Sequence, residues 1–229
     1  MPPAIFISGG SRGIGLAIAR KFHAEGFRTA VCARSGSALD AARSALPGLL
    51  AYRCDLGDKA QVKALARQLT EDLGPLDVLV NNAGIYRPGR VMDEDESVFE
   101  ELMAVNLHSA YYLTRGLLPP MLERRSGLIV NMSSVAGLQA YPNGGSYSIS
   151  KFALTGFSRN LREELKPYGI RVTALMPGAV FTDSWEGSGV PEERLMPAED
   201  IASLVWNAWT LSARSVVEDL VIRPQAGDL

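Results

Sequence analysis

The feature of this sequence that most constrains its fold is a regular alternation of short apolar runs with longer segments of helical spacing. The apolar runs predict strands near residues 4–8, 28–33, 49–54, 76–81, 127–133, 170–176 and 217–222. Helices are expected between them, for example over residues 59–73 after the N-cap residue Asp58, and over 198–211 after Pro197. Strands this apolar are typical of a parallel sheet that helices cover on both faces. We therefore predict a single α/β domain over residues 1–229, a doubly wound sheet with ligands at the carboxyl ends of its strands.

A glycine-rich turn follows the first predicted strand. It has the sequence Ser-Gly-Gly-Ser-Arg-Gly-Ile-Gly (residues 8–15) and precedes a segment of helical spacing that ends near Gly26. Between a strand and a helix, such a turn presents backbone N–H groups and a helix N-terminus to a pyrophosphate. A turn that serves only backbone geometry is the alternative. The residues expected to bind a nucleotide are Gly9, Ser11, Arg12, Gly13, Ile14 and Gly15.

A second motif pairs Tyr147 with Lys151, four residues later. On a helix these two side chains lie on one face. An ammonium group there favours the phenolate and is expected to lower the pKa of Tyr147. Such a tyrosine can give or take a proton at a carbonyl or alcohol oxygen. A plain aromatic–lysine contact on a half-buried helix is the alternative.

Together these motifs resemble the short-chain dehydrogenase/reductase family, and the match covers nearly the whole chain. The motifs stand in family order: the glycine turn, Asp55-Leu56, Asn81-Asn82-Ala83-Gly84, Asn106, Ser134, Tyr147 with Lys151, and Pro177-Gly178. The resemblance implies a Rossmann-type sheet of about seven strands. It also implies an oxidoreductase that transfers a hydride between a nicotinamide cofactor and a carbonyl compound or secondary alcohol. A non-catalytic NADP(H) sensor on the same fold is the alternative.

By this resemblance the catalytic residues are Asn106, Ser134, Tyr147 and Lys151. Tyr147 would be the general acid/base, and Ser134, thirteen residues earlier, would polarise the carbonyl, with Ser133 as the alternative serine. Lys151 would lower the tyrosine pKa and bind the nicotinamide ribose, and Tyr147 would also contact the cofactor. Asn106 would kink its helix and hold a water in a proton relay, and the alternative is a packing role.

The same resemblance assigns the remaining cofactor contacts. Asp55 and the Leu56 backbone would bind adenine, although Asp55 could instead serve a turn. The segment after the fourth strand would approach the adenine ribose, and the segment after the sixth strand would meet the nicotinamide carboxamide. Plain turns are the alternatives for both. The residues in these two segments are Asn82, Ala83, Gly84, Pro177, Gly178, Val180 and Thr182.

The end of the second predicted strand indicates which cofactor is bound. NAD sites commonly place an acidic residue there, on the ribose 2′-hydroxyl. This chain has Ala33 at that position, followed by Arg34, and Arg12 in the glycine turn could approach the same point. Two guanidinium groups bind a 2′-phosphate well. The pattern favours NADP(H) over NAD(H), with solvated surface positions as the alternative for the arginines.

Composition excludes several other classes of function. The formal net charge of −2 offers no basic surface for nucleic acid or an anionic membrane. No apolar run approaches the roughly 20 residues of a membrane span, and the first strand begins too early for a signal peptide, so a cytoplasmic protein is expected. Cys32 and Cys54 are expected to be small core residues. No cluster of metal-ligand spacing is present, and we expect no metal.

Substrate recognition and assembly are less fully specified. Residues 182–196, rich in Gly, Ser and Pro, resemble a flexible substrate lid. Tyr141, Trp185 and Met196 are expected either to line an apolar substrate pocket or only to pack against their neighbours.

Helices near 96–124 and 147–167 carry more apolar residues than one buried stripe needs, which predicts a homodimer or homotetramer. These residues are Phe99, Leu102, Met103, Leu107, Tyr111, Tyr112, Leu113, Leu117, Leu118, Phe152, Leu154, Phe157 and Leu161.

Overall fold

A parallel sheet forms the centre of the computed structural model, which describes residues 1–185, 187 and 189–228. Within these residues the strand order is β3-β2-β1-β4-β5-β6-β7, and all neighbouring strands are parallel. The predicted strands are confirmed, with limits that differ by at most two residues, as at β7, predicted from 217 and observed from 219. The strands are β1 (Ala4–Ser8), β2 (Arg28–Ala33), β3 (Leu50–Arg53), β4 (Val78–Asn81), β5 (Gly127–Met132), β6 (Ile170–Pro177) and β7 (Asp219–Ile222).

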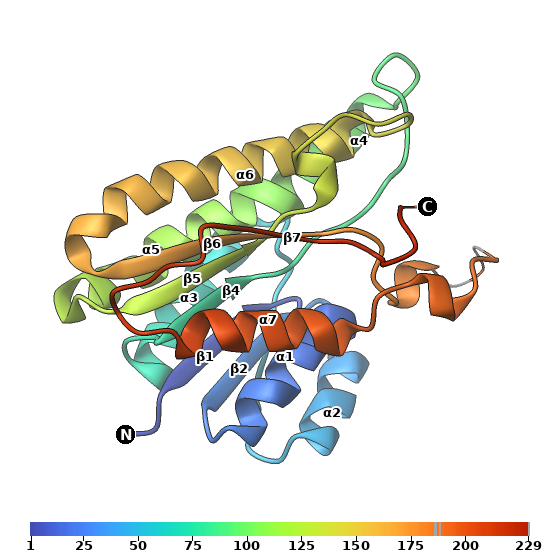
Figure 1. The fold of residues 1–229 in the computed structure, drawn as a ribbon. Helices are drawn as coiled ribbons and strands as arrows, with labels where there is room; N and C mark the ends of the chain where they lie inside the picture. The colour runs from blue at the N-terminus through green and yellow to red at the C-terminus, as the bar shows by residue number, and fades with distance from the viewer. Residues whose placement is uncertain (186, 188, 229) are drawn as a thin grey trace.

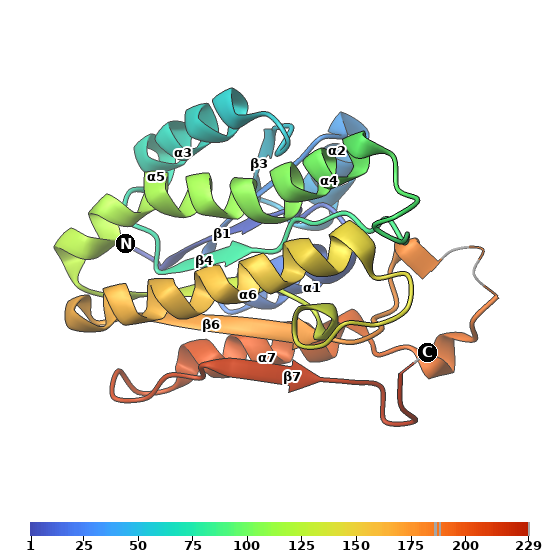
Figure 2. The same ribbon diagram turned by 90° about the horizontal axis from the view of Figure 1, so that it is seen from above.

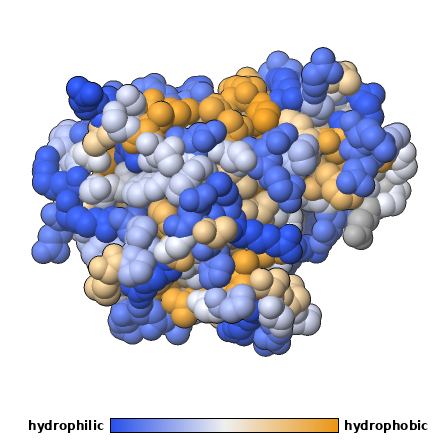
Figure 3. Space-filling view, turned by 60° about the horizontal axis from the view of Figure 1, so that its bottom comes forward, coloured by the Kyte–Doolittle hydropathy of each residue, from blue (hydrophilic) through white to orange (hydrophobic). Residues whose placement is uncertain are grey.

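Helices cover both faces of this sheet, as Figures 1 and 2 show. One layer contains α1 (Gly13–Ala24), α2 (Gly36–Ala45) and α7 (Ala198–Thr210). The other contains α3 (Lys59–Leu73), α4 (Glu96–Met103), α5 (Ser109–Arg124) and α6 (Gly145–Leu165). Figure 3 brings the first layer toward the viewer, and there hydrophobic side chains form separate patches divided by hydrophilic ones. The predicted two-sided cover of the sheet is confirmed.

The pleat of the strands divides the core between the two layers. Successive side chains of a strand point to opposite faces. Ile5 and Ile7 of β1 therefore pack with α1, α2 and α7, whereas Phe6 packs with α3, α5 and α6. Burial on both faces explains why the strands are continuous apolar runs. Cys32 and Cys54 are free and are buried on the same side of the sheet as Phe6, as expected of core residues.

The order of the strands reverses at β1, and this reversal positions the site. β2 and β3 lie on one side of β1, and β4 to β7 lie on the other. In such sheets a crevice opens at the carboxyl ends of the two central strands. The glycine turn occupies this position, and a side chain on Gly15 would overlap the carbonyl oxygen of Gly9. Only glycine at position 15 lets α1 begin this close to the end of β1.

The helices next to the site differ in detail from the prediction. The helix expected over 96–124 consists of α4 and α5 joined by a π-helix, Ala104–His108. A π segment accommodates an extra residue within a helix and locally changes its direction. The helix expected over 147–167 is α6, which begins two residues earlier, at Gly145. No helix among the described residues is long and apolar enough to span a membrane.

The segment expected to be a substrate lid, residues 182–196, has some regular structure. It contains two short 3₁₀ helices, Asp183–Trp185 and Glu192–Arg194. Val180 and Met196 form an isolated parallel bridge, which places the two ends of the segment side by side. Glu186 and Ser188 of the predicted lid lie outside the described residues.

Candidate active site

A cleft of about 770 Å³ opens at the carboxyl ends of β1, β2, β3 and β4. Ala33 and Tyr86 also contribute to its wall. Pro177, Gly178, Val180, Tyr147 and Lys151 of the predicted cofactor set lie outside the lining of this cleft. The predicted cofactor residues that line it are Gly9, Ser11, Arg12, Gly13, Ile14, Gly15, Arg34, Asp55, Leu56, Asn82, Ala83, Gly84 and Thr182.

Asn82 joins the two loops that meet in this cleft. Its side-chain Nδ2 donates to the carbonyl oxygens of Ser8 and Gly9, both at 3.0 Å. The Ser8 hydroxyl accepts from the backbone N–H groups of Asn82 and Ala83, also at 3.0 Å. These four hydrogen bonds hold the glycine turn against the end of β4. Ser8 was not a predicted site residue, because its partner loop lies more than 70 residues away in the sequence.

Ser134 and Tyr147 meet at the end of β5. The Ser134 side chain interacts with that of Tyr147 and acts to lower the pKa of the tyrosine. The Ser134 hydroxyl also accepts from the backbone N–H of Ala136 at 3.1 Å. Ser133 is directed elsewhere: its hydroxyl donates to the Lys151 carbonyl at 3.1 Å inside the protein. Of the two serines that the sequence left open, only Ser134 contacts Tyr147.

Lys151 lies beside this pair and is 4% exposed. Its Nζ donates to the Met132 carbonyl at 2.9 Å and lies 5.7 Å from the centre of the Tyr147 ring. Burial lowers the pKa of Lys151 to about 8, because the charged form loses its hydration.

The expected lowering of the tyrosine pKa is not found. Burial of the phenol raises the pKa of Tyr147, an interaction with the Ser134 side chain opposes this shift, and the neighbouring Tyr86 adds to it. The reason is that desolvation of the phenolate outweighs the favourable contacts in this position. Tyr147 therefore stays protonated well above neutral pH, the form that a proton donor requires.

Asn106 lies in the π-helix and is buried. Its Oδ1 accepts from the Ile85 N–H at 2.8 Å, and its Nδ2 donates to the Ser150 hydroxyl at 3.0 Å on α6. A Cβ atom added to Gly84 would lie 3.4 Å from both Asn106 Oδ1 and Lys151 Nζ. The amide oxygen and the ammonium therefore converge beside Gly84. Asn106 thus lies in a π-helical segment between α4 and α5, and both the predicted kink and its part in a water relay stay predictions.

The two arginines predicted to select the cofactor are placed differently. Arg34 lines the cleft together with Ser35, the N-cap of α2. Arg12 Nη1 forms an ion pair with Asp183 Oδ2 at 2.8 Å. Exposed ion pairs contribute only about 0–1 kcal/mol to stability, so a phosphate can compete with Asp183 for Arg12. Arg53 Nε donates to the Arg34 carbonyl at 3.3 Å, which adds a guanidinium to this edge that the sequence analysis missed.

Asp55 takes part in a turn as well as in the wall of the cleft. Its Oδ1 accepts from the Gly57 N–H at 2.9 Å, and its own N–H donates to Gln61 Oε1 at 3.0 Å. Both roles that the sequence left open for Asp55 are therefore compatible with its position. Leu56 follows it in the same wall.

The segment after β6 passes from the sheet to the cleft. The Gly178 N–H donates to a carbonyl of β7 at 2.8 Å, and Val180 is buried. Thr182 reaches the cleft, where it faces the glycine turn. Met196 belongs to the hydrophobic core and is 6% exposed, so of the two roles left open for it, packing is the one observed.

Two further tyrosines surround Tyr147. The ring centres of Tyr86 and Tyr147 are 4.8 Å apart, with an interplanar angle of 84°. Burial of Tyr141, together with its interactions with Tyr86 and Tyr147, raises the pKa of Tyr141. Tyr141 therefore lies near Tyr86 and Tyr147, and its part in a substrate pocket stays a prediction. Tyr86 was missed, because nothing in its sequence neighbourhood marks it as a contact of Tyr147.

Comparison with known proteins agrees with this geometry. The family profile described as short chain dehydrogenase matches residues 3–192. Sepiapterin reductase of Chlorobaculum tepidum is 34% identical, over 100% of this chain and 99% of that protein. A 3-oxoacyl-(acyl-carrier-protein) reductase of Haemophilus influenzae is 34% identical over 87% of each chain. The alcohol dehydrogenase of the archaeon Thermococcus sibiricus, solved with 5-hydroxy-NADP, has a TM-score of 0.90 and 29% identity, over 98% of this chain and 97% of that one.

The doubly wound sheet and the cleft at its point of strand reversal define a Rossmann-type dinucleotide-binding fold. Tyr147 packs on Tyr86 and Lys151 Nζ lies beside Gly84, so both side chains lie next to residues that line this cleft. The chain belongs to the short-chain dehydrogenase/reductase family.

Proposed function

We propose that the protein is an NADP(H)-dependent carbonyl reductase or alcohol dehydrogenase, with Tyr147 as its general acid/base. The observation that carries this proposal is the grouping of three side chains: Ser134 interacts with Tyr147, and Lys151 Nζ lies 5.7 Å from the centre of the tyrosine ring. A protein that only senses NADP(H) needs the cleft but has no use for this group of side chains. Relatives that match along most of the chain are named as reductases, which also supports catalysis.

The residues around the cleft fit a dinucleotide. The side chain of Arg12, the N-cap residue of α1, does not cap the helix, which leaves its first N–H groups for a pyrophosphate. Asp55 and Leu56 would hold the adenine, and Arg34 the 2′-phosphate. Bound NADPH would supply the hydride. Proteins of similar structure have been solved with NADP or NADPH, which favours the phosphorylated cofactor.

The side chains then have separate tasks in carbonyl reduction. Tyr147 gives its proton to the carbonyl oxygen, and its raised pKa keeps that proton available. Ser134 donates a hydrogen bond to the same oxygen and stabilises the negative charge that develops there. Lys151 holds the ribose. Together with Asn106 it also forms the polar group beside Gly84 through which Tyr147 regains the proton that it gave to the substrate.

A substrate screen tests this proposal. The panel contains sepiapterin, a 3-oxoacyl thioester, and simple aliphatic and aromatic ketones, each followed by NADPH absorbance. Loss of NADPH with one of them, matched by an equal amount of alcohol product, is the expected result. Tight NADPH binding without turnover of any compound would favour the sensor alternative instead.

Activity is expected to fall as the pH rises above about 8, the pKa of Lys151. Below this pH the lysine is charged, and above it the charge that holds the ribose is lost. The expected profile of kcat/KM for reduction decreases about tenfold per pH unit on the basic side. Kinetics between pH 6 and 10 provide the measurement, and Lys166→Met, a change at an exposed lysine paired with Glu163, is expected to leave the profile unchanged. A flat profile up to pH 10 would contradict the prediction.

We also propose that the protein assembles as a homodimer or a homotetramer. Several apolar residues used for this prediction are buried within the chain itself, among them Leu102, Leu113, Leu117, Leu154 and Leu161, so they cannot form an interface. Large side chains of the same helices remain exposed: Phe99 by 41%, Tyr111 by 37%, Ile149 by 42% and Phe152 by 44%. Such a face is typical of an interface.

Light scattering coupled to size exclusion is expected to give about two or four times the chain mass of 24.7 kDa. Phe152→Glu, which places a charge in the exposed apolar face, is expected to shift the mass toward the monomer because burial of an unpaired charge is costly. A parent protein that elutes with a mass near 24.7 kDa at micromolar concentration would refute the assembly.

A further inference from the structure

The loop between β4 and α4 reaches across to the start of α6. Glu94 in this loop binds Ser146: its Oε1 and Oε2 accept from the Ser146 backbone N–H at 3.0 and 3.2 Å. Its Oε2 also accepts a hydrogen bond from the Ser146 hydroxyl. Ser146 is buried and directly precedes Tyr147. A carboxylate 52 residues away in the sequence thus binds the turn of helix that carries the tyrosine.

The start of α6 lacks a side-chain cap from its own N-cap residue, Gly144. The first N–H groups of a helix have no partner within the helix, and its N-terminus favours negative charge. A carboxylate that accepts there makes charge-assisted hydrogen bonds, which are stronger than neutral ones. Glu94 therefore supplies the cap that the local sequence of α6 does not.

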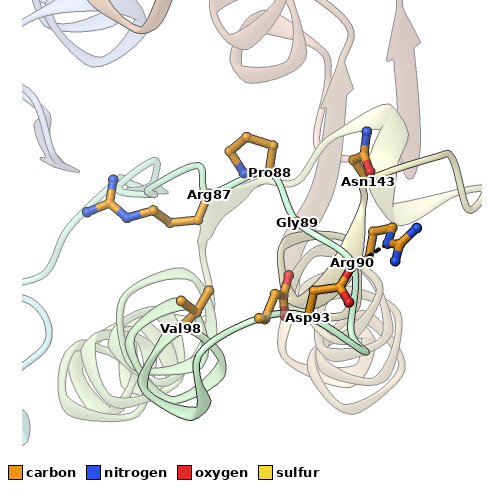
Figure 4. Close-up of a pocket in the computed structure, with 8 residues that line it drawn as sticks. Arg87, Pro88, Gly89, Arg90, Asp93, Val98 and Asn143 are labelled. Carbon is orange, nitrogen blue, oxygen red and sulfur yellow. Dashed lines mark hydrogen bonds and ion pairs between the residues drawn. The ribbon is translucent and has the colours of Figure 1, made fainter.

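The backbone around this contact is built for close approach. The Gly89 N–H donates to the Asn143 carbonyl at 3.0 Å, and Figure 4 shows Gly89 passing beside Asn143 at a pocket of about 670 Å³. A side chain on Gly145 would overlap both Glu94 Oε1 and the Gly89 carbonyl oxygen. Gly145 also has a φ of +41°, which other residues rarely adopt. Glycine at this position is what lets the loop lie against α6.

The same loop contacts Tyr147 at its other end. Tyr86, near the start of the loop, packs edge-to-face on the Tyr147 ring at 4.8 Å. The loop therefore holds the tyrosine from two sides, through its ring and through its backbone turn. We propose that Glu94 is a positioning residue for Tyr147, whose carboxylate fixes the first turn of α6 so that the tyrosine hydroxyl stays against Ser134. The role of this placement in catalysis rests on the proposed function, whereas the capping itself does not.

Three variants test the proposal. Glu94→Ala removes both acceptor oxygens, whereas Glu94→Gln keeps one acceptor for the Ser146 N–H and an amide group for the Ser146 hydroxyl. Asp93→Ala is the matched control, because Asp93 is an exposed carboxylate of the same loop that pairs with Arg90.

Glu94→Ala is expected to lower kcat about tenfold, since small displacements of a catalytic group have large effects on rate. The Kd of NADPH is expected to stay within about twofold, and the primary isotope effect with deuterated NADPH to increase as the chemical step becomes limiting. Glu94→Gln is expected to keep kcat within about threefold of the parent, and Asp93→Ala to match the parent. A loss of NADPH affinity as large as the loss of kcat would indicate general damage and overturn the proposal.

Hydrogen exchange separates this proposal from the proposed function. The amides of the first turn of α6 are expected to exchange faster in Glu94→Ala than in Asp93→Ala, whether or not a substrate is known. Unchanged exchange in this turn would overturn the capping role even if the enzyme proves active. Faster exchange with an unchanged kcat would overturn the positioning role. If the parent protein reduces no carbonyl compound, the proposed function fails, and the exchange rates alone decide whether Glu94 caps α6.

Discussion

Replacing Tyr147 with phenylalanine is expected to lower kcat for carbonyl reduction by at least about a hundredfold. The variant keeps the ring, and with it the edge-to-face contact with Tyr86 at 4.8 Å. It loses the hydroxyl that interacts with the Ser134 side chain and that would protonate the substrate oxygen. The Kd of NADPH is expected to remain largely unchanged, because Tyr147 lies outside the wall of the cofactor cleft. Steady-state kinetics and a fluorescence titration with NADPH measure the two quantities separately.

Tyr168→Phe provides the control for this variant. Tyr168 is an exposed tyrosine in the short helix that follows α6, and the same loss of a hydroxyl is expected to leave kcat unchanged. Equal turnover by Tyr147→Phe and the parent enzyme would sink the assignment of Tyr147 as proton donor.

Replacing Ala33 with aspartate is expected to weaken NADPH about tenfold to a hundredfold more than NADH. Ala33 ends β2 in the wall of the cleft, directly before Arg34. A carboxylate there repels the 2′-phosphate of NADPH and can accept from the free 2′-hydroxyl of NADH. Arg34→Ala is expected to act in the same direction, because loss of a charge-assisted contact costs about 1.5–3 kcal/mol. The measurement is the ratio of the two dissociation constants in each variant.

Arg43→Ala is the matched control for Arg34→Ala. Arg43 is an exposed arginine on α2 that pairs with Asp40, so its removal is expected to leave the ratio unchanged. A parent enzyme that binds NADH as tightly as NADPH would contradict the inference from Ala33 and Arg34. The ion pair of Arg12 with Asp183 makes Arg34 the more direct test of cofactor choice.

Most of the fold could be predicted from the sequence, because the signals involved are local. The strands are buried on both faces, so each is a short apolar run that stands out between helical segments. The cap of α3 is likewise local: Asp58 accepts from the N–H groups of Ala60 and Gln61, as expected of an N-cap. The limits of α6 were displaced by two residues, since its start is capped from a distant loop.

The candidate site could be predicted where residues act close to their neighbours in the chain. The glycine turn, Asn82 to Gly84 and Thr182 line one cleft because parallel strands bring their carboxyl ends to one edge of the sheet. The pairing of Tyr147 with Lys151 follows from helical spacing alone. The sequence could not indicate the pKa of Tyr147, because that value depends on how deeply the folded chain buries the phenol.

The amino-acid sequence by itself therefore determined the succession of strands and helices along the chain, the glycine turn and the motif residues of the site. Only the tertiary structure decided that Ser134 rather than Ser133 contacts Tyr147. It also decided that Asp183 pairs with Arg12, and that Glu94 caps the turn of α6 that carries Tyr147. The physical reason is that these contacts join segments far apart in the chain. Their hydrogen bonds and burial exist only once the sheet and helices are assembled, and no local pattern of residue types encodes them.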